Sequence, residues 1–155
     1  MEIEQGKARK LTLIDSCVLI VLFGAAACVL TPAVSGAMEE KKLSDMVQRL
    51  QIIRSQISLF RSEHKGLLPG QHTAVDAVTS EEFVAAMKQL CLEGTAPYLT
   101  QMPANPYISD PGAAAAITCV NDPGAKPTGQ EGTGWWFNAA TGDFYACDSA
   151  FHTNY

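Results

Sequence analysis

The chain has no charged residue between Ser16 and Met38. As a helix rising about 1.5 Å per residue, these 23 residues span about 34 Å, which is enough for the apolar core of a bilayer. Basic residues lie close before this stretch, and Glu39 and Glu40 follow it. The positive-inside rule therefore predicts a cytoplasmic N-terminus, with everything after Met38 exported.

Several kinds of site are also missing from the sequence. It holds no Cys-x-x-Cys pair, no zinc-type Cys/His spacing, no EF-hand loop, no phosphate-binding loop and no internal repeat. His64, His72 and His152 stand far apart along the chain. No set of residues positions a nucleophile or pairs carboxylates for catalysis, so the sequence predicts no metal site and no enzyme.

Basic charge is scarce in the exported part. Residues 39–155 hold eight Lys and Arg against thirteen Asp and Glu, a net charge of −5. Such a surface favours solubility and gives no electrostatic footprint for nucleic acid.

A cleaved secretory signal is the alternative interpretation of the apolar stretch. The basic start, the run VLIVLFGAAACVL and the small residues of VSGA or AAA fit such a signal. Asp15 inside the hydrophobic flank, and the helical pattern that follows, favour a retained anchor instead.

Proline and glycine are absent between Ala37 and Lys65, where a helical pattern is present. Apolar residues recur there at steps of three and four: Leu43, Met46, Leu50, Ile53, Ile57 and Phe60. This spacing predicts one long helix from near Leu11 to near His64. Gly66 is its expected C-cap, and Pro69 stops its continuation.

A second helix is expected at Ser80–Cys91, because Thr79 and Glu82 form a capping box. A connector rich in proline follows, and then a predicted strand at Ala113–Val120.

The segment WWFNAATGDFYAC predicts a hairpin. Its strands are Trp135–Asn138 and Asp143–Cys147, joined by a turn around Ala139–Gly142. Its aromatic residues alternate, so we expect one face in the core and the other at the surface. The fold class is thus α+β, with the apolar stripe of the long helix packed on a small antiparallel sheet of three or four strands.

The three exported cysteines allow more than one disulfide. Cys119 and Cys147 lie on predicted strands that are expected to be adjacent, which favours that pair. Cys91 is then a thiol or pairs with one of the two, and sequence does not choose among the three pairings.

The N-terminal part resembles the type IV pilin and type II secretion pseudopilin family. Family subunits begin with a basic leader ending in glycine, followed by Phe-Thr-Leu-Ile-Glu and an apolar helix. Here Lys10 is followed by Leu11-Thr12-Leu13-Ile14-Asp15, and the family's helix glycine and proline correspond to Gly24 and Pro32. The segments YLTQMPANPY and GWWFNAATGDFYA are similar to the connector and final hairpin of the secretion-type members.

Two residues depart from the family pattern. Lys10 stands where the leader peptidase of the family needs glycine, and Asp15 replaces glutamate. Cleavage between Lys10 and Leu11, with methylation of the new amine, is therefore one of two alternatives. The other is an uncleaved subunit that remains anchored.

The resemblance implies a role for Asp15 in assembly. A carboxylate at bilayer depth costs about 2.5–3.5 kcal/mol on insertion scales and usually keeps a partner. In a filament Asp15 can pair with the amine at Leu11 of a neighbour, or with Lys10 or Arg9 if the leader is kept. The other interpretation places Asp15 in the headgroup layer beside Lys10.

Gly24 and Pro32 are the other two residues with an expected part in assembly. Pro32 loosens or kinks the helix, and Gly24 allows close helix contact. Some secretion-type members bind calcium near the final strands, and Asp110, Asp122, Asp143 and Asp148 are candidates by residue type alone.

Together these patterns predict a single-pass protein of the inner membrane with three parts. They are a cytoplasmic basic leader at 1–10, a transmembrane helix at 11–38 and an exported pilin-like domain at 39–155. The expected function is that of a structural subunit of a type IV pilus-like or type II secretion pseudopilus filament. Its expected partners are its own copies, other pilin-like subunits, the prepilin peptidase, the assembly machinery and lipid. The alternative function is a membrane-tethered binding module that does not polymerise.

Overall fold

The structure is a computed structural model that describes the backbone of residues 13–92, 94 and 96–155, and side chains from Gly36 onward within that part. The chain divides into two compact units, Met1–Glu40 and Lys41–Tyr155. The predicted leader at 1–10 lies outside the described residues, as do Leu11 and the side chains of the predicted membrane segment up to Ser35. Among the residues that are described, no helix is both long and apolar enough to cross a membrane.

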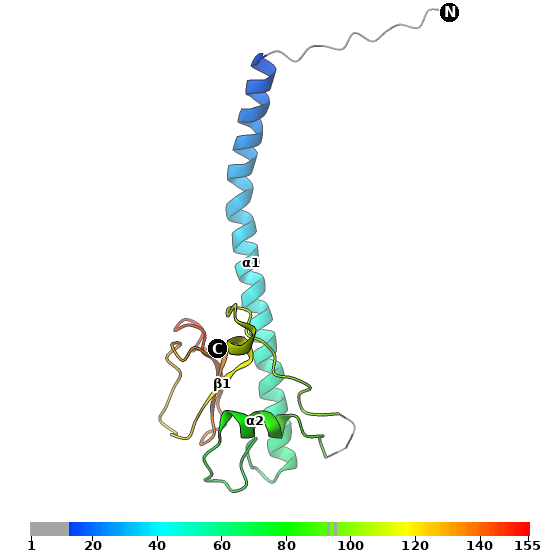
Figure 1. Cartoon of the computed structure of the whole chain (residues 1–155), viewed down its shortest axis with the longest axis vertical. Helices are drawn as coiled ribbons and strands as arrows, with labels where there is room; N and C mark the ends of the chain where they lie inside the picture. Colours follow the sequence, from blue (N-terminus) through cyan, green and yellow to red (C-terminus); the bar gives the residue numbers. More distant parts are fainter. Residues whose placement is uncertain (1–12, 93, 95) are drawn as a thin grey trace, which may run out of the picture. The chain divides into compact units, whose positions relative to one another are not determined.

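The element order is helix, two short helices and then strands, so the fold class is α+β, as the sequence predicts. Helix α1 extends from Leu13 to Glu63 (Figure 1). Five of its predicted stripe residues are buried: Met46, Leu50, Ile53, Ile57 and Phe60. They share one hydrophobic core with Trp135, Phe137 and Phe144 of the sheet. The expected packing of this stripe on the sheet is therefore confirmed.

The end of α1 differs in one residue from the expectation. Lys65, not glycine, takes the first left-handed position after the helix, with φ 57°, and Gly66 follows at φ 90°. The Gly66 N–H donates to the carbonyl of Arg61 at 2.9 Å, which closes a Schellman turn.

Helix α2 (Ser80–Met87) begins where the capping box predicts. Thr79 accepts from the Glu82 N–H, and the Glu82 carboxylate accepts from the Thr79 N–H at 2.8 Å. The expected end at Cys91 is wrong, because α2 stops at Met87 and Leu90 forms an isolated β-bridge with Pro97.

The predicted strand at Ala113–Val120 is wrong in its first half. Pro111–Ala115 forms the short helix α3, capped by Asp110, and strand β1 covers only Ile117–Val120. Proline is favourable in the first turn of a helix, and Asp110 accepts from the Ala113 N–H at 2.8 Å.

The sheet has three strands in the order β1-β2-β3. Strand β2 (Trp135–Asn138) pairs antiparallel with β3 (Phe144–Ala146), so the predicted hairpin is confirmed with a shorter second strand. Strand β1 pairs parallel with β2, so the sheet is mixed and the expected antiparallel sheet is wrong. The loop between Val120 and Trp135 returns the chain to the starting end of the sheet, which makes the parallel pairing possible.

The aromatic residues of β2 are buried on both faces of the sheet, which contradicts the expected surface-exposed face. Trp136 is only 2% exposed, although it alternates with the fully buried Trp135 and Phe137. The ring of Trp136 contacts that of Tyr145, with centroids 5.8 Å apart. Hairpin alternation alone does not reveal this, because burial of the second face depends on segments distant in sequence.

Gly134 marks a close approach between α3 and the start of β2. Its N–H donates to the Ala113 carbonyl at 2.8 Å, and a Cβ at this position would lie 2.1 Å from the Ala114 carbonyl oxygen. Two backbone segments thus meet where no side chain fits.

We expect Gly134→Ala to lower the free energy of unfolding by about 2 kcal/mol or more, because the backbone of α3 or β2 must shift to make room for the methyl group. Thermal unfolding of the full-length chain in detergent measures this. Gly124→Ala is the matched control, because a Cβ there would lie 3.4 Å from Asp122 Oδ1, an ordinary contact. Equal unfolding temperatures for the two variants would contradict the close approach.

Candidate functional site

The residues predicted to act in assembly lie in the first unit. Lys10 and Leu11 are outside the described residues, and Asp15, Gly24 and Pro32 lie on the backbone of α1 without described side chains. The structure therefore places the last three on one helix, and no contact of theirs is described.

Cys91, Cys119 and Cys147 are thiols in the structure, and no disulfide joins the cysteines whose side chains are described. Cys119 lies on β1 and Cys147 directly follows β3, with β2 between the two strands. Neighbouring strands are about 4.8 Å apart, so two strand spacings exceed the ~7 Å limit between the Cα atoms of a disulfide. This geometry argues against the favoured Cys119–Cys147 pair, which assumed adjacent strands.

Burial makes two of these thiols weaker acids than an ordinary cysteine thiol. It raises the pKa of Cys119 to about 11, against a smaller opposing effect of a hydrogen bond with Ser80. Burial likewise raises the pKa of Cys147 to about 11, although the thiol contacts Thr133. Because the thiolate is the reactive form, both groups are protonated and unreactive near neutral pH.

A polar cluster holds the last residues of the chain. His152 Nδ1 lies 2.6 Å from Asp148 Oδ2, and the ring of Tyr107 contacts the imidazole with centroids 4.3 Å apart. Asn105, which is 1% exposed, donates through Nδ2 to Asp148 Oδ1 at 2.7 Å and to the Gly134 carbonyl at 3.0 Å. The cluster ties the segment after β3 to the connector.

Sequence reasoning missed this cluster and treated His152 as isolated. The spacing of four residues between Asp148 and His152 was the available signal. The third element, Asn105, comes from a connector 43 residues before Asp148, so only the fold reveals the full set. Ser149 Oγ is buried in the same turn and makes no hydrogen bond, so the imidazole does not activate this hydroxyl.

A second cluster surrounds Arg54 of α1. Its guanidinium donates to the Phe144 carbonyl at 2.9 and 2.6 Å and to the Tyr155 carbonyl at 2.8 Å. It also lies over the Tyr145 ring, 5.5 Å from the centroid. Burial lowers the pKa of Arg54, with weaker opposing effects of Tyr145 and Asp143, and the group remains charged at any physiological pH.

A cleft of about 270 Å³ opens beside Arg54, between α1 and the turn that joins β2 to β3. Its lining residues on α1 include Arg54, Ser58 and Arg61, and on the hairpin they are Gly142, Asp143, Phe144 and Tyr145. Two guanidinium groups on one side make this cleft suitable for an anionic group.

The four candidate calcium ligands are not brought together. Asp110 caps α3, Asp122 accepts from the Gly124 N–H, Asp143 binds the Thr141 hydroxyl and Asp148 belongs to the His152 cluster. Within the described part of the chain, no group of three or more His, Cys, Asp or Glu side chains has the geometry to hold a metal ion.

Comparisons with known protein families, with characterised proteins and with solved structures found no match for this chain.

We expect Cys119 and Cys147 to be alkylated about a hundredfold more slowly in the folded chain at pH 8 than after unfolding. A pKa of about 11 leaves a thiolate fraction roughly a hundredfold below that of an ordinary thiol. Pulsed alkylation of the protein from membranes, followed by peptide mass spectrometry, measures both rates. The same digest tests the pairing: a linked Cys119–Cys147 peptide would overturn the thiol assignment.

Proposed function

We propose that this protein is a structural subunit of a type IV pilus-like or type II secretion pseudopilus filament. It assembles with its own copies and with other pilin-like subunits through its apolar N-terminal helix. Its N-terminus lies in the cytoplasm, its apolar helix lies in the inner membrane, and its globular domain is exported.

The observation that carries this proposal is that one helix contains an uncharged apolar stretch followed by an amphipathic stretch. Helix α1 (Leu13–Glu63) contains the uncharged stretch Ser16–Met38 and, further on, the stripe that forms the core with the sheet. A helix that is apolar all round in one part and amphipathic in the next suits a membrane or subunit-packing segment followed by a folded domain.

The sequence of the apolar part adds support. Asp15, Gly24 and Pro32 keep the register of the pilin family when counted from Leu11. An acid at this depth is costly unless it finds a cationic partner, so pairing on assembly favours one register of parallel helices. The cationic partner is the Leu11 amine in a processed subunit, and Lys10 or Arg9 in an unprocessed one.

A specific residue favours a second candidate function, a membrane-tethered binding module that does not polymerise. Lys10 occupies the position where the family's leader peptidase requires glycine. A subunit that keeps its leader has no free amine at Leu11 and remains tethered by the same helix.

We expect Asp15→Ala to abolish filaments that can be sheared from cells, because the variant loses the charge that pairs neighbouring helices. Its amount in the membrane should stay within about twofold of wild type, since removal of an acid makes insertion more favourable. Glu40→Ala is the matched control, because it removes an exposed carboxylate from the same helix. Unchanged filaments in Asp15→Ala would refute the pairing.

The mass of the protein isolated from membranes separates the two candidates. Loss of the first ten residues, with one methyl group added at Leu11, would support the filament subunit, because it creates the Leu11 amine that pairs with Asp15 of a neighbour. Intact-mass measurement with N-terminal peptide mapping provides the test. An unprocessed N-terminus, in cells that lack sheared filaments, would support the tethered module instead.

A further inference from the structure

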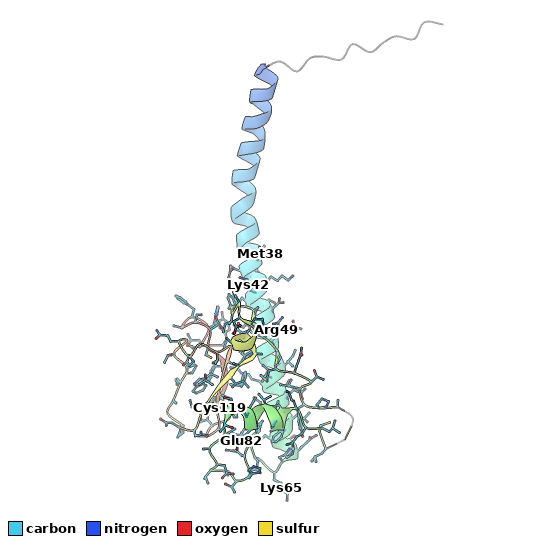
Figure 2. The ribbon with its side chains drawn as sticks, viewed as in Figure 1. Met38, Lys42, Arg49, Lys65, Glu82 and Cys119 are labelled. Atoms are coloured by element: carbon cyan, nitrogen blue, oxygen red, sulfur yellow. The ribbon has the colours of Figure 1, made fainter. Side chains whose placement is uncertain are left out.

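Charge is unevenly divided within the second unit. From Arg49 to Lys65 the sequence holds four basic residues and one acid, whereas residues 66–155 hold nine acids and two lysines. The second half of α1 is therefore basic, and the rest of the domain is acidic. Figure 2 shows Lys65 at the end of α1 and Glu82 on α2.

Two arginines of α1 bond to main-chain oxygens. Arg54 donates to the Phe144 carbonyl and to the main-chain oxygen of Tyr155, and Arg49 donates to the Ala104 carbonyl. Arg61 is exposed on the cleft that Arg54 lines. We call the part of this cleft formed by Arg54, Ser58 and Arg61 the basic cleft. Within it Arg61 and Ser58 are exposed, and Arg54 is half-buried.

The acids bond mainly to neutral donors. Asp76 accepts from the N–H groups of His72 and Thr73, and Glu82 accepts from Thr79. Glu81 and Asp122 are exposed, and Asn121 Oδ1 accepts from the Val78 N–H, which brings this loop to the start of α2. We call Asp76, Glu81, Glu82 and Asp122 the acidic face. Glu82 is also exposed, and Asp76 is half-buried.

We propose that the basic cleft of one copy docks the acidic face of a second copy of this chain. This inference rests on the proposed self-assembly and names the surfaces that meet outside the membrane. Because the two surfaces differ, the contact is heterologous, and such contacts form open chains unless the rotation closes a ring.

Charge complementarity is the reason to choose a second copy as the partner. Arg61 is exposed in the cleft, and the carboxylates of Asp76 and Glu82 bond to neutral donors, so these groups keep their capacity to pair across an interface. Arginine pairs with carboxylates through two parallel hydrogen bonds, and Arg61 is the cleft residue suited to this, because Nε and Nη2 of Arg54 already donate to Phe144 and Tyr155. Asp143 also lines the cleft: its carboxylate accepts from the Thr141 hydroxyl at 2.7 Å, and its negative charge acts on Arg54.

The test uses the full-length chain in its native membrane with a photo-crosslinking amino acid in place of Ser58. Ser58 is exposed and lines the cleft, and its hydroxyl bonds back to the Arg54 carbonyl of its own helix at 3.0 Å. We expect irradiation to give a dimer whose mapped adduct lies on the second copy between residues 76 and 82 or at 121–122. Salt at about 1 M should lower the yield, because it screens exposed charges within about 3 Å.

Charge reversal gives the sharper readout. Arg61→Glu and Glu81→Lys should each reduce the crosslink at least about fivefold, because an attraction between exposed groups becomes a repulsion. Cells that make both variants together should regain it, since the acid introduced at position 61 of one copy then meets the lysine introduced at position 81 of the other. Lys41→Glu and Glu40→Lys are the matched controls, because they reverse exposed charges on α1 outside the cleft.

Four results would overturn the docking: no dimer, an adduct on α1 of the second copy, an adduct on another protein, or a yield that the reversals leave unchanged. The outcome is separate from that of the proposed function. Sheared filaments with a crosslink insensitive to charge would refute the docking and leave the filament intact. A charge-dependent dimer in cells without filaments would support the docking and count against the filament.

Discussion

Burial of one stripe of α1 against the sheet is the interaction on which the rest of the structure depends. Met46, Leu50, Ile53, Ile57 and Phe60 are at most 5% exposed, and they share a core with the aromatic residues of β2 and β3. Each such side chain contributes about 1.5–3 kcal/mol when fully buried, and the net stability of a domain is only about 5–15 kcal/mol. The stripe also fixes the rotation of α1, which decides that Arg54 and Arg61 lie beside the hairpin.

The small sheet is completed by contacts that lie far apart in sequence. Asn105 joins the connector, α3 and the last residues: its N–H donates to Ala114, its Nδ2 to Gly134 and Asp148, and its Oδ1 accepts from the Tyr107 N–H. Every polar atom of this buried side chain thus has a partner, which offsets the cost of removing it from water and makes the network specific. The same cluster brings the chain end to Arg54, which binds the Tyr155 carbonyl.

The proposed function and the proposed docking use different properties of the same helix. The proposed assembly in the membrane depends on apolar surface and on one acid, whereas the proposed docking depends on exposed charged groups of the folded domain. Membrane packing gains little from apolarity alone, because lipid is equally apolar, so polar groups and shape decide which neighbours fit. In water, exposed charges are individually weak and select partners and register more than they add affinity.

The sequence by itself determined the elements whose signals are local. The stripe spacing predicted α1, the Thr79–Glu82 box predicted the start of α2, and the alternation in WWFNAATGDFYAC predicted the hairpin. The tertiary structure decided the features that depend on how distant segments of the chain come together. It made β1 parallel to β2, buried Trp136, separated Cys119 from Cys147, and joined Asn105 to Asp148 and His152. The physical reason is that periodicity and capping act over a few residues, whereas strand order and burial are set by which distant segments pack together.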